Sequence, residues 1–214
     1  MRLTLLLLIL LACNHFPLRK SQPYLGRSQE LPGILECEWY DTGGEGVAYH
    51  DSDTVNNGSG KLNPANGDSL NEFRMGEGVD ISYTKGHGID ENPFNKVKRD
   101  TGRLYVGWTQ PGEWIRYSIT VKETGNYRLS LLYTANGEGQ VDLDIDDIPT
   151  NMKWNIGSTH DDRDTVAWRQ WHHWNIQQSP HTIHLDKGNH VLTLHTIAHG
   201  EMNFDHIEFV KQDN

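Results

Sequence analysis

The sequence is poor in cysteine and in positive charge, and each shortage narrows the classes of protein it can encode. Its 214 residues include only two cysteines, Cys13 and Cys37, so a disulfide-rich framework is excluded. Lysine and arginine number 19 against 29 aspartates and glutamates, which gives a formal net charge of -10. A nucleic-acid-binding protein normally carries a basic patch that displaces counterions from phosphate, so we expect no nucleic acid as a partner. The length suits one domain of ordinary size with a tail.

Helical patterning and the motifs of common catalysts are also missing. No apolar stripe of helical period persists over the roughly ten residues that a helix needs. The sequence has no nucleophile elbow, no phosphate-cradling glycine loop and no setting for a cysteine nucleophile. Glycosidic hydrolysis needs two carboxylates that face each other across a cleft, and an abundance of acidic residues does not place such a pair. An enzyme is therefore an alternative without support from a motif.

The N-terminus carries a targeting signal. In MRLTLLLLILLAC one arginine precedes an unbroken apolar run, which is typical of a secretory signal and too short for a membrane span. Its last four residues, LLAC, resemble the bacterial lipobox, at which the signal is cut before a cysteine that then carries lipid. We expect residues 1–12 to be removed and Cys13 to anchor the protein in the bacterial cell envelope, so that membrane contact is through lipid only. The alternative is an ordinary signal peptide with a chance cysteine, which would leave the protein secreted.

Alternation of apolar and polar residues dominates the rest of the chain and predicts strands. Ile115, Tyr117 and Ile119 would share one face of a strand, with polar residues between them on the other. Many short strands, joined by Gly- and Asn-rich turns without strand–helix alternation, predict an all-β fold, a β-sandwich of the jelly-roll type. We expect a tether at residues 13–33 and the domain at residues 34–212. The predicted strands are residues 34–39, 79–83, 104–108, 114–121, 127–133, 140–145, 182–185, 191–196 and 203–210, and loops over one rim occupy residues 54–103.

Three carboxylates stand near the two ends of the predicted domain. Glu36 and Glu38 are two residues apart on its first strand, so their side chains would point the same way. Asp205 lies in register with core residues of the last strand, and a carboxylate that faces the core needs neutralising. If the first and last strands pair, three hard oxygen ligands for a structural Ca²⁺ come together. The alternatives are solvated carboxylates or a pairing with Arg74 or Arg116.

A transition-metal site is a further alternative. The 12 histidines make neither an HExxH motif nor a cysteine–histidine knuckle, and neighbours in a strand point apart. Once Cys13 carries lipid, Cys37 has no disulfide partner and is interpreted as a small buried side chain. Core packing or a structural ion must then stabilise the domain, which favours the calcium interpretation.

The stretch AWRQWHHWN, residues 167–175, spaces three tryptophans three residues apart. If the stretch is a strand, Trp168 and Trp174 share a face and Trp171 opposes them, so the two sets cannot both face the core. An exposed indole offers a flat apolar face to a sugar ring, and neighbouring Asn, Gln and His side chains can hydrogen-bond its hydroxyls. Packing of all three rings inside the fold is the alternative.

Four segments of the chain carry the motifs of one protein family. They are ILECEWYDTGGEGVAYHD at residues 34–51, VGWTQPGEWIRY at 106–117, WRQW at 168–171 and NFDHIEF at 203–209. Together, and in this order, they resemble family 6 of carbohydrate-binding modules over residues 34–212. The resemblance implies a β-jelly roll with a structural calcium ion and a sugar-binding cleft made by loops at one end. Some members of that family bind on a concave face instead.

The resemblance also assigns roles to single residues. The side-chain calcium ligands of the family match Glu36, Glu38 and Asp205. Trp108 and Trp168 match the two rings that clamp the sugar, and Asn203 matches the amide that hydrogen-bonds it. Trp171 matches a strand tryptophan with a packing role, but a shift of the alignment by three residues would exchange it with Trp168, so Trp171 is also a candidate sugar-binding residue.

We therefore expect a non-catalytic protein, held on the bacterial surface by lipid, that binds poly- or oligosaccharide for partner glycoside hydrolases or transporters. Residues 54–103 exceed the minimal module and either extend or block the cleft. One alternative is a small polysaccharide lyase or glycoside hydrolase on the same fold. Another is a structural or adhesion lipoprotein with a vestigial cleft. The glycan and its linkage depend on loop shape and are not identified by the sequence.

Overall fold

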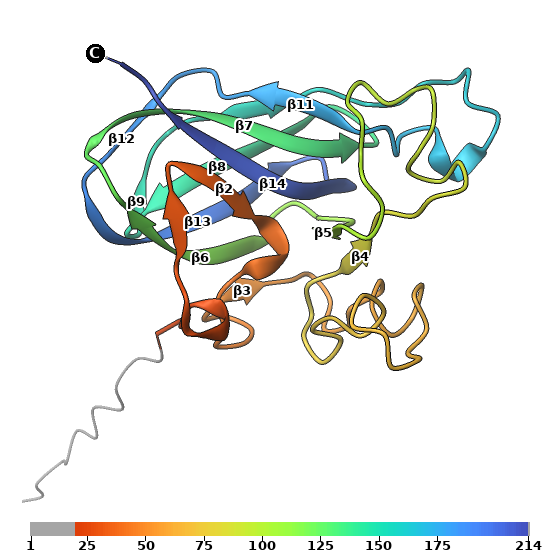
Figure 1. Cartoon of the computed structure of the whole chain (residues 1–214), viewed down its shortest axis with the longest axis horizontal. Coiled ribbons are helices and arrows are strands. Elements are labelled where there is room, and N and C mark those ends of the chain that lie inside the picture. Colours follow the sequence, from red (N-terminus) through yellow and green to blue (C-terminus); the bar gives the residue numbers. More distant parts are fainter. Residues whose placement is uncertain (1–19, 214) are drawn as a thin grey trace, which may run out of the picture.

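Two stacked β-sheets make up the protein in a computed structural model that describes residues 20–213 (Figure 1). The predicted signal peptide and Cys13 lie outside the described residues. The strands are β1 (Gln29–Leu31), β2 (Gly33–Glu36), β3 (Tyr49–His50), β4 (Ile81–Tyr83), β5 (Leu104–Val106), β6 (Trp114–Val121), β7 (Gly125–Ala135), β8 (Gly139–Ile145), β9 (Ile148–Pro149), β10 (Trp154–Ile156), β11 (Asn175–Gln178), β12 (Ile183–Leu185), β13 (Gly188–Ala198) and β14 (Met202–Lys211). Three short 3₁₀ helices join them, η1 (Tyr24–Gly26), η2 (Cys37–Trp39) and η3 (Ala167–Arg169).

The strand order shows how the two sheets are assembled. The first sheet runs β1-β6-β13-β8-β10, with β3 paired to β6 and β9 to β8. The second runs β11-β7-β14-β5-β4, with β12 paired to β7 and β2 to β14. The first and last strands of the predicted domain, β2 and β14, are antiparallel neighbours, as the calcium prediction requires. The predicted all-β sandwich is confirmed.

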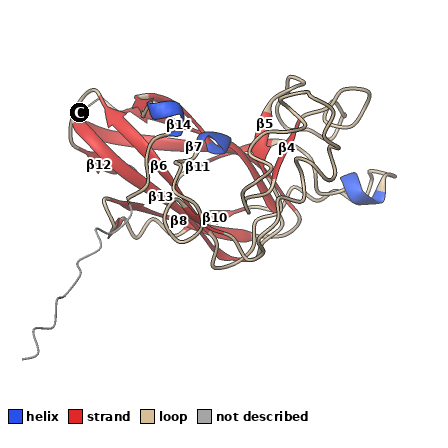
Figure 2. Ribbon diagram, turned by 90° about the horizontal axis from the view of Figure 1, so that it is seen from below, coloured by secondary structure: helices blue, strands red, loops and turns tan. Residues whose placement is uncertain are grey.

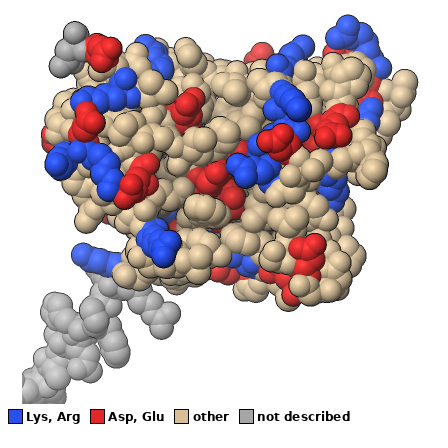
Figure 3. Space-filling view, in the orientation of Figure 1, with Lys and Arg blue, Asp and Glu red and all other residues tan. Residues whose placement is uncertain are grey.

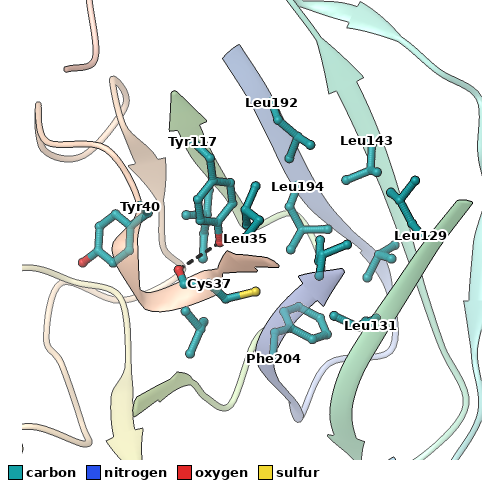
Figure 4. Packing of buried hydrophobic residues seen from close by; sticks show 14 of the residues in the cluster. Leu35, Cys37, Tyr40, Tyr117, Leu129, Leu131, Leu143, Leu192, Leu194 and Phe204 are labelled. Atoms are coloured by element: carbon teal, nitrogen blue, oxygen red, sulfur yellow. Dashed lines mark hydrogen bonds between the residues drawn. The ribbon is translucent and has the colours of Figure 1, made fainter. Parts of the chain in front are cut away.

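Alternating burial along the strands builds one core between the sheets. Every second residue of β6 is buried from Ile115 onward, as the sequence pattern predicts. Figure 4 shows the leucines of β7, β8 and β13 meeting Phe204 of β14 in this core. Cys37 is fully buried there, and the Tyr117 hydroxyl donates to its carbonyl oxygen at 3.0 Å. Packing therefore holds the sheets together, and Cys37 is a free thiol.

The structure differs from the predicted elements near the N-terminus. The strand expected at residues 34–39 ends at Glu36, and the chain turns into η2, which buries Cys37 and Glu38. β1 lies within the predicted tether, yet it pairs with β6 and Leu31 is fully buried. A strand of three residues is too short to show alternation, so the sequence did not reveal that the folded domain begins before residue 34.

Apart from β4, residues 54–103 form loops over one end of the sandwich, drawn in amber to yellow-green at the right of Figure 1. Arg74 fastens this segment to the chain after η2, because its guanidinium donates to the carbonyl oxygens of Tyr40 and Asp41. The same group pairs with Glu77 at 2.9 Å and lies over the Tyr40 ring. The segment is therefore tied to the body of the domain.

The surface carries both signs of charge. On the face drawn in Figure 3, acidic and basic side chains are interspersed, as expected for a protein without a basic binding patch. Within residues 20–213 there is no helix with the length and apolarity to cross a membrane.

A substitution in the core tests the placement of the two sheets. Replacing the fully buried Leu131 of β7 by alanine should lower the free energy of unfolding by about 2–5 kcal/mol, because the lost side chain leaves a cavity between the sheets. Urea unfolding measures this value. The neighbouring Ser130→Ala on the outer face of β7 is the control, and an equal loss in both variants would contradict this placement of the core.

Candidate functional site

A cleft of about 590 Å³ opens at the loop end of the sandwich. Figure 2 shows the loops gathered at this end, with η3 projecting at the right. The walls of the cleft come from residues 54–103, the segment after β5, the β7–β8 turn, η3 and the β13–β14 turn. The lining residues are Leu62, Tyr83, Lys85, Ile89, Asp90, Tyr105, Trp108, Asn136, Trp168, Trp171, His172 and Glu201. The long loop segment therefore extends the cleft rather than blocking it.

Two of the three clustered tryptophans lie on the cleft wall. The segment is not a strand: η3 begins at Ala167, and residues three apart in a 3₁₀ turn eclipse one another. Trp168, which is 57% exposed, and the half-buried Trp171 therefore both face the cleft. The prediction that Trp171 packs inside the sandwich is wrong for this reason. The packing role belongs to Trp174, which is fully buried against Tyr105.

Trp108 also lines the cleft, but it comes from a segment that is distant in sequence from Trp168 and Trp171. It follows β5 and has a φ of 48°, a left-handed conformation that costs a non-glycine residue about 1–2 kcal/mol. Its backbone N–H donates to Asn203 Oδ1 at 3.0 Å. This bond ties the strained residue to β14 and fixes where its indole can lie.

Asn203 does not reach the cleft surface, which corrects its predicted contact with sugar. Its side chain is buried, and both polar ends are engaged. Oδ1 accepts from Trp108, while Nδ2 donates to Thr134 Oγ1 at 2.8 Å and to His172 Nδ1 at 3.0 Å. Asn203 is therefore a positioning residue behind the wall.

A buried carboxylate joins the walls of the cleft. Asp90 accepts from the His172 ring at 2.7 Å, from Trp174 Nε1 at 2.8 Å and from the backbone N–H of Lys85 at 2.6 Å. Burial alone would raise the pKa of Asp90, but these hydrogen bonds outweigh it and leave the pKa below its ordinary value. Because Asp90 only accepts, His172 carries its hydrogen on Nε2 and accepts from Asn203 at Nδ1. The bonds of Asp90 to His172 and Trp174 were not visible in the sequence, because their partners lie 82 and 84 residues apart along the chain.

A second carboxylate stabilises residues 167–175, which we call the tryptophan segment. Asp164 is fully buried and accepts from Arg169 Nε at 2.6 Å and from His173 Nε2 at 3.0 Å. Arg169 also donates to the carbonyl oxygen of Gly88 in the long loop segment. The Arg169 hydrogen bond holds the pKa of Asp164 far below its ordinary range.

An acidic hollow of about 310 Å³ adjoins the cleft at Trp108. Burial raises the pKa of Asp51 to about 7 and that of Asp80 to about 6. Glu113, on the same hollow, accepts the backbone N–H groups of Ser52 at 3.0 Å and Gln110 at 2.7 Å. Glu113 therefore links two loops, while Asp51 and Asp80 are partly buried carboxyl groups beside the half-buried indole of Trp108.

The predicted calcium ligands lie apart from the cleft, on β2, η2 and β14. Single ligand atoms of Glu36, Asp205 and His206 lie within 4.8 Å of one another. Glu38 Oε2 is buried and has no hydrogen-bond partner, and burial, followed by the charge of Glu36, raises the pKa of Glu38 to about 8. Glu38 is not among the three residues whose ligand atoms cluster, but its orphaned carboxyl, which interacts electrostatically with Glu36, fits a hard cation.

Two arginines also approach this carboxylate group. Arg99 forms a buried ion pair with Asp205, and Arg103 lies 3.9 Å from Glu36. The partners considered from the sequence are engaged elsewhere, Arg74 with Glu77 and Arg116 with Asp147. A cation at this site would therefore share Asp205 with Arg99.

Comparison with known proteins identifies the family. The model of the carbohydrate binding module family 6 matches residues 80–211, more than half of the chain, so the protein belongs to that family of non-catalytic binding modules. A family 6 module from Clostridium stercorarium, solved with cellobiose, is similar to this chain in fold, with 12% identity over 87% of this chain and 99% of that one and a TM-score of 0.50. No curated protein sequence matches.

Two other solved structures are similar at lower scores. A family 35 carbohydrate binding module from Clostridium thermocellum has 18% identity over 62% of this chain and 88% of that one, with a TM-score of 0.41. A cycloisomaltooligosaccharide glucanotransferase from Paenibacillus sp. has 15% identity over 88% of this chain, with a TM-score of 0.45. This chain spans about 19% of the length of that enzyme.

The Asp164 ion pair makes a testable prediction. Asp164→Asn should lower the free energy of unfolding at pH 7 by about 3 kcal/mol, because it leaves the Arg169 guanidinium unpaired. Since the folded pKa of Asp164 is lowered, its stabilisation is present above the unfolded value of about 4 and is lost as the pH falls toward the folded pKa. The gap between wild type and variant in urea unfolding should therefore shrink from pH 7 to about pH 3.

The control for this prediction is Asp162→Asn. Asp162 is exposed and pairs only with His160 in the described chain, so the change should cost less than about 1 kcal/mol. A similar loss in both variants, or a gap that does not change with pH, would rule out the structural role of Asp164.

Proposed function

We propose that the protein binds poly- or oligosaccharide in the cleft without cleaving it. The observation that carries the proposal is the meeting of Trp108, Trp168 and Trp171, from two distant segments, around one cleft. Their ring faces suit the apolar C–H faces of sugar rings. Asn136, at the rim, can hydrogen-bond hydroxyl groups. Family membership supports the same function.

The wall is held in place before a ligand arrives. Trp108 is fixed through Asn203, and the η3 segment is fixed through Asp164 and Asp90. A rigid aromatic surface loses little conformational entropy on binding, so more of the stacking energy is available as affinity.

Polysaccharide cleavage is the alternative, and it would have to use the acidic hollow beside Trp108. Asp51 and Asp80 have pKa values near neutrality, as a general acid requires. Asp90 in the cleft itself has a lowered pKa and three hydrogen-bond donors around it, so it is unsuited to donating a proton. Release of reducing ends from a glycan panel separates the two functions, because a binding protein releases none.

The clamp can be tested by substitution. Trp168→Ala should weaken glycan binding in affinity electrophoresis by more than about 1 kcal/mol, because the exposed ring supplies a stacking face and little core packing. The control is Trp39→Ala, since Trp39 is similarly exposed at 46% but lies outside the cleft. Equal retardation of Trp168→Ala and wild type would refute the assignment.

We also propose that the carboxylates of Glu36, Glu38 and Asp205 hold a structural Ca²⁺. A bound divalent ion would stabilise the charged form of Glu38, whose buried Oε2 otherwise has no partner. It would also offset the mutual repulsion of the ligands and link β2, η2 and β14.

Calcium removal gives the corresponding prediction. EDTA should lower the melting temperature, and added Ca²⁺ should restore it without changing glycan affinity, because the carboxylates lie outside the cleft. Glu38→Gln should abolish the calcium-dependent shift, whereas Glu208→Gln, an exposed change on the same strand as Asp205, should keep it. A melting temperature that is indifferent to both EDTA and Ca²⁺ would count against the ion.

We propose, finally, that lipid on Cys13 anchors the protein in the bacterial cell envelope, where it acts beside glycoside hydrolases. In Figure 1 the described chain starts at the lower left, whereas the cleft loops lie at the right. An anchor at the N-terminus would therefore leave the cleft facing away from the membrane. Metabolic labelling with a palmitate analogue, lost in Cys13→Ser, tests the anchor.

A further inference from the structure

The cleft holds a lysine ammonium on a wall that is otherwise rich in aromatic rings. Lys85 follows β4 in the long loop segment, lines the cleft and is half-buried. Its Nζ lies 4.8 Å from the centroid of the Tyr83 ring, another lining residue. The charge is thus placed beside the surfaces on which a sugar would stack.

A neutral partner positions this ammonium. Nζ donates to Asn63 Oδ1 at 2.6 Å, and the buried Asn63 donates from Nδ2 to Ser82 Oγ at 3.1 Å. The second bond turns the amide oxygen toward Lys85 and its NH₂ group away. An ammonium has three donors, so this arrangement fixes Nζ and leaves donors for a ligand.

No carboxylate neutralises Lys85 at ion-pair distance among residues 20–213. Asp90 receives the backbone N–H of Lys85 and the ring donors of His172 and Trp174. Glu201, the other lining carboxylate, accepts from Asn136. Burial lowers the pKa of Lys85, and the charge of Asp90, which lies beyond ion-pair distance, offsets this shift only in part.

We propose that Lys85 binds an anionic substituent of the saccharide, a uronate carboxylate or a sulfate ester, and so makes the cleft selective for acidic glycans. The proposal rests on the carbohydrate-binding function proposed above. Charge-assisted hydrogen bonds to a fixed ammonium are stronger than those to a hydroxyl, particularly where rings exclude water. The formal net charge of -10 repels polyanions in general, so a preference for acidic glycans would have to come from a local cation such as this one.

Matched glycan pairs test the proposal with the domain in solution. Polygalacturonate is compared with its carboxyl-reduced form, and iota-carrageenan with its desulfated form, by affinity electrophoresis and calorimetry. The wild type should bind at least one acidic member at least ten-fold more tightly than its neutral form. The pair that shows the preference identifies carboxylate or sulfate as the ligand group. Lys85→Met should remove the preference, while Lys187→Met, an exposed change in the turn before β13, should retain it.

The outcomes separate this proposal from the binding function itself. Binding that is lost in Trp168→Ala but is equal for acidic and neutral forms, or unchanged in Lys85→Met, overturns the role of Lys85 and leaves the cleft intact. Binding that is indifferent to Trp168→Ala, or no binding to any of the four glycans, counts against both proposals.

Discussion

The buried carboxylate of Asp90 is the interaction on which the site depends. It lies in a loop that has almost no regular structure, yet it receives donors from Lys85, His172 and Trp174. One anion therefore joins the loop segment of residues 54–103 to the tryptophan-rich stretch of residues 167–175. The three bonds keep the carboxylate ionised despite burial, and an ionised group in that place in turn requires its donors to stay.

The remaining walls are held by the same kind of bond between distant parts of the chain. Asn203 reaches from β14 to the backbone of Trp108, and Asp164 holds the η3 segment through Arg169. Side chains that carry the polar network lie behind the cleft, while rings and a few polar ends face into it. This arrangement suits a binding surface. The buried polar groups hydrogen-bond to one another, and the exposed groups remain accessible to a ligand.

Sequence reasoning succeeded where a short-range pattern reports the structure directly. Alternation along residues 114–121 predicted β6 with its boundaries. Trp108 and Trp168, which the family resemblance matched to a sugar clamp, both line the cleft. It failed where local conformation departs from a strand. The family resemblance gave Trp171 a packing role on a strand, but the chain makes a 3₁₀ turn there, and Trp171 lines the cleft together with Trp168. Lys85 carried no signal, because nothing near it in the sequence marks a cleft.

The sequence by itself determined that this is an all-β protein with strands buried on one face, because apolar alternation is a property of adjacent residues. It also determined the family, through motifs that are short and contiguous. Only the tertiary structure decided which polar side chains line the cleft and which form the hydrogen bonds behind its wall. Asn203 and Lys85 show the reason. Asn203 is held behind the wall by its bond to Trp108, and Lys85 is positioned by its bond to Asn63. Only folding brings these partners together.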